Sequence, residues 1–129
     1  MSSPNATVVQ KFLDAFAGGD VTTALSCFAE DCVVDEAHGL PFSGRYVGRA
    51  GFLDILGRMS AHFDAKVTSV QVLDAGEVVV GKLGLTFTSK TTGRELATTV
   101  VELYTVEQGE ITQADVYYKD PAALSALAG

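Results

Sequence analysis

Apolar and polar positions divide the chain into a helical first half and a strand-rich second half. Helical spacing of apolar residues, Gly and Pro punctuation and short β-like runs mark the boundaries. In order, the first half predicts a helix from Pro4, capped by Ser3, to Gly18; a short helix from Asp20 with apolar members up to Phe28; a strand centred on 32–35; a loop over 38–48; and a helix over 49–63.

The second half reads as hairpin-linked strands rich in Val, Thr, Leu and Phe. Strands are expected around 67–72, 77–91, 96–106 and 111–118, with turns at TTGRE and EQGE and a terminal helix capped by Asp120 before Pro121. Helices followed by hairpins favour an α+β fold with an antiparallel sheet. A single curled sheet wrapped around its helices leaves a concave space, which is where ligands bind.

Composition limits the classes of function. The 129 residues predict one domain, 1–129, and the 16 acidic against 9 basic residues give a net charge of −7. No positive stripe for nucleic acid and no apolar run long enough for a membrane is visible. The start MSSPNAT shows no secretory signal, so a cytoplasmic location is expected. Cys27 and Cys32 are expected to be two small buried side chains.

Several segments together resemble a known family. AGGD after the first helix, FAEDCVVDEA, GLPFSGRYVGRAGF and VYYKDPAAL follow one another as in the nuclear-transport-factor-2-like superfamily. The chain is most similar to its SnoaL-like and ketosteroid-isomerase-like branch. This resemblance implies a cone-shaped α+β barrel with a deep apolar pocket, often in a homodimer. It also implies functions that range from cyclases, isomerases and dehydratases to epoxide hydrolases and non-catalytic binders, so the fold alone does not settle the function.

The resemblance suggests three acidic site residues. Glu36 in CVVDEA matches the carboxylate base of the isomerases, and Glu102 in TVVELYTV matches their second acid. Asp115 lies close to the catalytic aspartate in the last strand of SnoaL-like cyclases. The isomerase tyrosine of the first helix is replaced by Phe12, so steroid isomerase activity is not expected.

Strand alternation suggests how two of these acids would work. Glu102 shares a largely apolar face with Tyr104, and the opposite face is apolar too, so the strand is expected to be covered on both sides. Desolvation would raise the pKa of Glu102 and keep it protonated as a hydrogen-bond donor, while an ionised Glu36 takes a proton from carbon. The structural alternatives are that Glu102 pairs with a Lys or Arg, and that either Asp35 or Glu36 is solvated, because they point to opposite faces.

The remaining candidates would contact substrate. They are His38, a loop histidine that is either solvated or a proton shuttle at the pocket mouth, and the aromatic residues Phe12, Phe16, Tyr104 and Tyr117. Tyr118 is a further candidate for a hydrogen bond to a ligand carbonyl. Two distant histidines predict no metal site, and no phosphate-binding loop is found, so no cofactor is expected.

We therefore expect a cofactor-independent cyclase, isomerase or dehydratase that acts on an apolar carbonyl compound such as a polyketide. The alternative is a non-catalytic protein that binds a small apolar organic ligand in the same pocket. An epoxide hydrolase with an Asp–Arg–Asp arrangement ranks third, because its candidate arginines, Arg45 and Arg58, fall outside persuasive strand positions.

Overall fold

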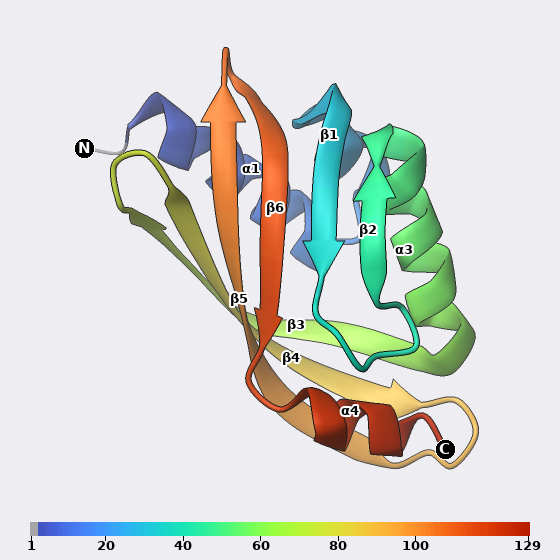
Figure 1. Cartoon of the computed structure of the whole chain (residues 1–129). Coiled ribbons are helices and arrows are strands. Elements are labelled where there is room, and N and C mark those ends of the chain that lie inside the picture. Colours follow the sequence, from blue (N-terminus) through green and yellow to red (C-terminus); the bar gives the residue numbers. More distant parts are fainter. Residues whose placement is uncertain (1–2) are drawn as a thin grey trace.

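The computed structural model describes residues 3–129 and shows four helices and six strands within them (Figure 1). In chain order these are α1 (Pro4–Ala17), α2 (Val21–Ser26), β1 (Phe28–Glu36), β2 (Gly44–Val47), α3 (Gly48–His62), β3 (Phe63–Asp74), β4 (Val79–Ser89), β5 (Glu95–Glu107), β6 (Glu110–Tyr118) and α4 (Pro121–Leu127). The expected α+β class is confirmed.

The N-terminal helices begin where capping chemistry predicts. The Ser3 side chain accepts a hydrogen bond from the Ala6 amide at 3.1 Å, and Asp20 accepts one from the Thr23 amide, also at 3.1 Å. The expectation for Phe28 was wrong: α2 ends at Ser26, and Phe28 is the buried first residue of β1. Apolar spacing alone could not separate the last turn of a short helix from a strand start.

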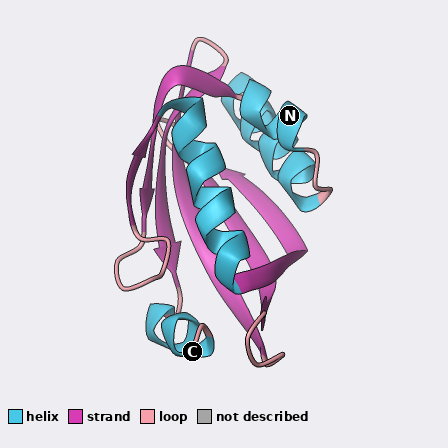
Figure 2. Cartoon of the chain, turned by 90° about the vertical axis from the view of Figure 1, so that its right-hand side faces the viewer, coloured by secondary structure: helices cyan, strands magenta, loops and turns pink. Residues whose placement is uncertain are grey.

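The six strands form one curved sheet in the order β2-β1-β6-β5-β4-β3. Figure 2 shows α3 and the N-terminal helices on the same side of this sheet. All neighbouring strands are antiparallel except β1 and β6, which run parallel. The predicted antiparallel sheet is thus found except at this pair, where β6 returns to the middle of the sheet in the direction of β1.

The segment predicted as a loop over 38–48 contains a strand. Residues 44–47 form β2, which pairs with the end of β1 from Val33 to Glu36 at the edge of the sheet. β2 is only four residues long, and the residues around it are turn formers. It shows no clear alternation of apolar and polar side chains, so its strand conformation depends on pairing with β1.

The predicted turn at EQGE is confirmed. Gln108 and Gly109 both have positive φ angles, 51° and 78°, as a two-residue hairpin loop requires. At the C-terminus, Asp120 accepts a hydrogen bond from the Ala123 amide at 3.0 Å and caps α4, which buries Leu124. The cap predicted from Asp120 and Pro121 is confirmed.

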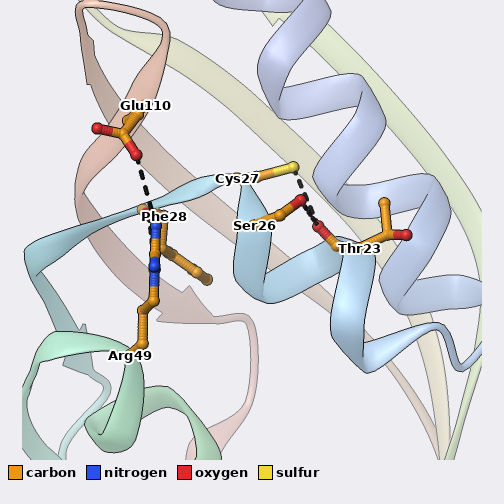
Figure 3. A network of polar contacts seen from close by, with 6 residues as sticks. All are labelled: Thr23, Ser26, Cys27, Phe28, Arg49 and Glu110. Atoms are coloured by element: carbon orange, nitrogen blue, oxygen red, sulfur yellow. Dashed lines mark hydrogen bonds and ion pairs between the residues drawn. The ribbon is translucent and has the colours of Figure 1, made fainter.

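Arg49 connects α3 to the starts of β1 and β6 (Figure 3). Its Nε and Nη2 donate hydrogen bonds to the Phe28 carbonyl oxygen at 3.0 and 2.8 Å, and Nη2 lies 3.5 Å from a carboxylate oxygen of Glu110. Because Phe28 and α3 both border the interior, this contact holds two walls of the concave space together.

The core lies between the concave face of the sheet and the helices. Cys27 and Cys32 are free and buried, as predicted. The outer face of β5 is less covered than expected, since Val101 and Leu103 are only half-buried. Within residues 3–129, no helix is both long and apolar enough to cross a bilayer.

Candidate functional site

A cavity of about 40 Å³ lies between the concave face of the sheet and helices α1 and α3. Its lining is apolar apart from two glutamates and two tyrosines. The lining residues are Phe12, Phe16, Phe28, Val34, Glu36, Phe52, Ile55, Leu56, Met59, Leu83, Leu85, Val100, Glu102, Tyr104, Ala114 and Tyr118. This set holds no Lys, Arg or His, so no basic side chain neutralises the two acids.

Glu36 points into this cavity because of strand alternation. Val34 and Glu36 are buried, whereas Asp35 between them is directed to the outer face. Glu36 is only 6% exposed, and its buried Oε1 has no hydrogen-bond partner among the described residues. A buried polar atom without a partner destabilises the fold unless a ligand or water pairs with it.

Glu102 and Tyr104 enter the cavity from the same face of β5. The Tyr104 hydroxyl, fully buried, donates a hydrogen bond to Oε1 of Glu102. Glu102 as a residue is half-buried, but this contact places its carboxyl among buried groups. No Lys or Arg within residues 3–129 forms an ion pair with Glu102, so the structural alternative for it is not observed.

A glycine makes room for the tyrosine ring. Gly81 of β4 lies opposite Glu102 in the sheet. A Cβ atom at Gly81 would lie 2.9 Å from Cε2 of Tyr104 and 2.9 Å from Cδ1 of Leu13. The absence of a side chain at Gly81 thus lets Tyr104 pack across β4 and reach Glu102.

The two carboxyl groups differ in acidity. Burial raises the pKa of Glu36 from 4.5 to about 8, and the nearby Glu102 carboxylate adds to this rise. Burial also raises the pKa of Glu102, but the Tyr104 hydrogen bond opposes the effect and leaves it at about 6. Burial thus raises the pKa of Glu102 as the sequence predicts, but the pKa of Glu36, which was expected to be the ionised base, is raised further, so Glu36 is neutral near pH 7.

Aromatic rings form much of the cavity wall. Phe12 occupies the centre, with its ring centroid 4.9 Å from Phe28, 5.7 Å from Phe52 and 6.0 Å from Tyr104. The interplanar angles are near 67°, the edge-to-face arrangement that aromatic pairs prefer. Phe12, Phe16 and Tyr104, which the sequence predicts to contact substrate, all line this cavity, and the contact itself stays a prediction.

Three predicted site residues lie elsewhere. Asp115 and Tyr117 are on the outer face of β6, where the Tyr117 hydroxyl donates a hydrogen bond to Asp115 Oδ2 at 2.7 Å. His38 is exposed in the loop after β1 and lines a surface groove with Asp115; Glu36 and Tyr118, which line the cavity, also line this groove. The structure thus corrects the expected placement of Asp115 and Tyr117, because alternation directs Ala114 and Tyr118 toward the interior.

Phe28 and Phe52 line the cavity but were not among the predicted site residues. Phe52 was recognised only as an apolar member of a helix, and Phe28 was assigned to the wrong element. Tyr118 was considered as a ligand contact, and burial raises its pKa well above the usual value, with the Glu36 and Glu102 charges adding to the rise. Its inward direction could have been found only with the register of β6.

Two other kinds of site, an epoxide hydrolase site and a metal site, find little support in the described residues. Arg45 is exposed on β2, and Arg58 pairs with Asp54 at 3.4 Å and lies 5.6 Å from the Tyr46 ring centroid. Neither arginine lines the cavity, so the Asp–Arg–Asp arrangement of an epoxide hydrolase is not assembled there. Residues 3–129 contain no cluster of three or more His, Cys, Asp or Glu side chains suited to a metal ion.

Comparison with known proteins supports the fold. An NTF2-like protein of unknown function from Burkholderia pseudomallei superimposes with a TM-score of 0.88 at 19% identity, covering 98% of each chain. TerC, co-crystallised with polyporic acid, gives 0.87 at 21% identity and also covers 98% of each chain. A Xanthomonas campestris protein named "putative polyketide cyclase" gives 0.80 at 27% identity and covers 96% of each chain.

No curated protein matches the chain in sequence. The profile of the SnoaL-like domain, however, matches residues 9–114, which extend from within α1 to within β6. On this match the chain belongs to the SnoaL-like family within the NTF2-like fold.

Proposed function

We propose that this protein is an acid–base enzyme that enolises an apolar carbonyl compound in the interior cavity, as a cyclase, isomerase or dehydratase without a cofactor. The observation that carries the proposal is the pair of carboxyl groups in one apolar cavity, of which Glu36 has an oxygen without a hydrogen-bond partner and Glu102 accepts a hydrogen bond from Tyr104. Groups whose environments separate their pKa values are suited to act as acid and base on one substrate.

The acidities assign the two roles. Glu102, the more acidic group, is the base: its carboxylate removes a proton from the carbon next to the carbonyl, and the C–H electron pair becomes the enolate double bond. Glu36, neutral up to about pH 8, donates its proton or a hydrogen bond to the carbonyl oxygen. Its unpaired Oε1 shows that this carboxyl has hydrogen-bonding capacity which the protein itself does not use.

The cavity lining supports one general class of substrate. Phenylalanine and aliphatic side chains surround the four polar groups, so an apolar carbonyl compound is favoured over a sugar or a nucleotide. The structural neighbour named "putative polyketide cyclase", which is 27% identical to this chain, supports the same class.

The proposal is tested with a simple enolisable ketone. Exchange of the C2 protons of cyclopentanone for deuterium, followed by proton NMR in D₂O, measures proton abstraction without knowledge of the natural substrate. Glu102→Gln and Glu36→Gln should each reduce protein-dependent exchange by about 100- to 10,000-fold, the usual value of one acid or base. Glu77→Gln, in the exposed turn after β3, is the matched control and should exchange like the wild type.

Wild-type exchange rates in folded Glu36→Gln and Glu102→Gln proteins would refute the assignment. A wild-type protein that binds the ketone but does not accelerate exchange would favour the second candidate, a non-catalytic binding protein. One observation supports that candidate. The Tyr104 hydroxyl already donates its hydrogen bond to Glu102, and Phe12 has no hydroxyl that could bind a substrate oxygen.

We also propose the homodimer and the cytoplasmic location that were expected from the sequence. The half-buried Val101 and Leu103 on the outer face of β5, with exposed Tyr117 beside them on β6, offer an apolar surface for a second copy. Light scattering tests the dimer, and a monomer at micromolar concentration would remove it without affecting the cavity.

A further inference from the structure

Tyr118 brings a phenol into the cavity that the chemistry described above leaves without a role. It lies at the end of β6, the strand next to β1 in the sheet, and lines the cavity together with Ala114 of the same strand (Figure 1). Its ring packs against Phe42 and Phe87, with ring centroids 5.9 and 6.3 Å apart. This packing restricts the rotamer of Tyr118 and, with it, the direction of the hydroxyl group.

The Tyr118 hydroxyl has no hydrogen-bond partner within residues 3–129. The hydroxyls of the other three tyrosines, Tyr46, Tyr104 and Tyr117, each donate a hydrogen bond within this part of the chain. A tyrosine that is largely buried usually pairs its hydroxyl group. A ligand or water oxygen is therefore expected to accept a hydrogen bond from Tyr118.

The four polar groups of the cavity thus form two pairs. Glu102 and Tyr104, both on β5, are hydrogen-bonded to each other. Glu36 and Tyr118 are the last residues of β1 and β6, which are neighbouring parallel strands, and both have unused hydrogen-bonding capacity. These two residues also line the same two spaces, the cavity and the surface groove, so they lie close together. One ligand oxygen between them can accept a hydrogen bond from each.

Both members of the second pair carry a proton near neutral pH. Glu36 is neutral up to about pH 8. Burial raises the pKa of Tyr118 well above its usual value, and the charges of Glu36 and Glu102 raise it further. Both groups can therefore donate, and a carbonyl oxygen has two lone pairs with which to accept.

We propose that Tyr118 donates a second hydrogen bond to the carbonyl oxygen of the substrate, which is held between Glu36 and Tyr118 on the β1–β6 side of the cavity. This inference rests on the proposed function for the nature of the substrate. When Glu102 removes the proton from the neighbouring carbon, the C–H electron pair becomes the carbon–carbon double bond and the carbonyl π pair moves to the oxygen. Tyr118 keeps its proton and stabilises the negative charge that develops on this oxygen.

Tyr118→Phe tests this role because it removes only the hydroxyl group and keeps the ring against Phe42 and Phe87. Cyclopentanone is the probe for two measurements: deuterium exchange at saturating ketone, and the infrared stretching band of its carbon-13-labelled carbonyl group in the bound state. A hydrogen bond to the carbonyl oxygen lowers the frequency of this band. Tyr46→Phe is the matched control, because that buried hydroxyl donates to the Phe42 and Ser43 carbonyl oxygens and Tyr46 does not line the cavity.

Tyr118→Phe should slow exchange by about 100- to 1,000-fold, the usual cost of one donor to a developing oxyanion, and should move the carbonyl band to higher frequency. Its midpoint of urea unfolding should stay near that of the wild type, because no hydrogen bond within the described residues is lost. Tyr46→Phe should unfold at a lower urea concentration, because it leaves two backbone carbonyl oxygens without this donor. Its exchange rate and carbonyl band should match those of the wild type.

An unchanged carbonyl band in Tyr118→Phe would overturn the inference, because any slower exchange would then come from packing alone. Exchange at the wild-type rate in Tyr118→Phe, a large drop in its unfolding midpoint or the absence of a bound-ketone band in the wild type would overturn it as well. A band that shifts in Tyr118→Phe while the wild type fails to accelerate exchange would support the contact with the carbonyl oxygen and refute only the catalytic proposal.

Discussion

Replacing Glu36 with glutamine should stabilise the protein, and the gain should grow with pH. In the wild type, Glu36 is neutral in the folded state up to a pKa of about 8, but in the unfolded chain it ionises near its usual 4.5. Between these values the folded protein binds a proton that the unfolded chain has released. The stabilisation due to neutral Glu36 is thus fully present below pH 4.5 and is lost as pH rises through about 8.

The structure sets the size of this effect. The gap between 4.5 and about 8 corresponds to at most about 5 kcal/mol, at about 1.4 kcal/mol per pH unit. Water that enters the cavity around an ionised carboxylate recovers part of this, so we expect about 2–4 kcal/mol above pH 8. Glutamine keeps the shape of the side chain but does not titrate, so the variant avoids the loss.

Urea unfolding from about pH 5 to about pH 9 measures the difference in the free energy of unfolding between variant and wild type. All other titrating groups are common to both proteins, and most of their contribution cancels. Glu77→Gln, at an exposed position, should show a pH-independent difference near zero. A Glu36→Gln difference that stays constant across this range would mean that Glu36 is solvated, and the account of the cavity would be wrong.

Three further changes test neighbouring parts of the structure. Tyr104→Phe removes the hydrogen bond that lowers the pKa of Glu102, so the pKa should rise above about 6, as followed by carbon-13 NMR of the glutamate carboxyls; an unchanged midpoint would contradict the contact. Gly81→Ala should displace the Tyr104 ring and thereby raise the pKa of Glu102 in the same NMR titration. Gly57→Ala, at an exposed position of α3, should leave this pKa unchanged and stabilise the fold by up to about 1 kcal/mol. Arg49→Met should lower the free energy of unfolding by about 1–2 kcal/mol, because it removes the hydrogen bonds to the Phe28 carbonyl oxygen. Glu110→Gln removes only a half-exposed ion pair and should lower the free energy of unfolding by less than about 1 kcal/mol; equal losses would contradict this ranking of the two contacts.

The sequence predicted what local chemistry decides. Helix starts at Ser3, Asp20 and Asp120 and the hairpin at Gln108–Gly109 follow from capping and from backbone angles of single residues. By contrast, β2 exists because β1 offers a pairing edge, and the parallel β1–β6 pair joins segments far apart in the chain. Contacts of that kind leave no periodic signal in the chain.

The same distinction explains the candidate site. Alternation correctly grouped Glu102 with Tyr104 and Asp115 with Tyr117, but it could not show which face of each strand is covered. The sheet has register shifts between Phe28 and Val33 and between Thr105 and Val106, so counting along the strands could not place Asp115. The order of the two glutamate pKa values was also beyond the sequence, because it depends on which carboxyl the Tyr104 hydroxyl reaches.

The unpaired oxygen of Glu36 is the strongest physical reason to assign a ligand to the cavity. A valine or leucine there would bury similar volume and would avoid both the desolvated carboxyl and the repulsion from Glu102. Packing therefore gives no reason for a glutamate at this position. A ligand oxygen that accepts a hydrogen bond from the neutral carboxyl would supply the missing partner. A catalytic requirement for a proton near neutral pH would also explain why a glutamate is found here. Both explanations need an uncharged ligand oxygen beside Glu36. Binding of a neutral ketone is therefore expected both for an enzyme and for a non-catalytic binding protein, and only turnover of the ketone distinguishes the two.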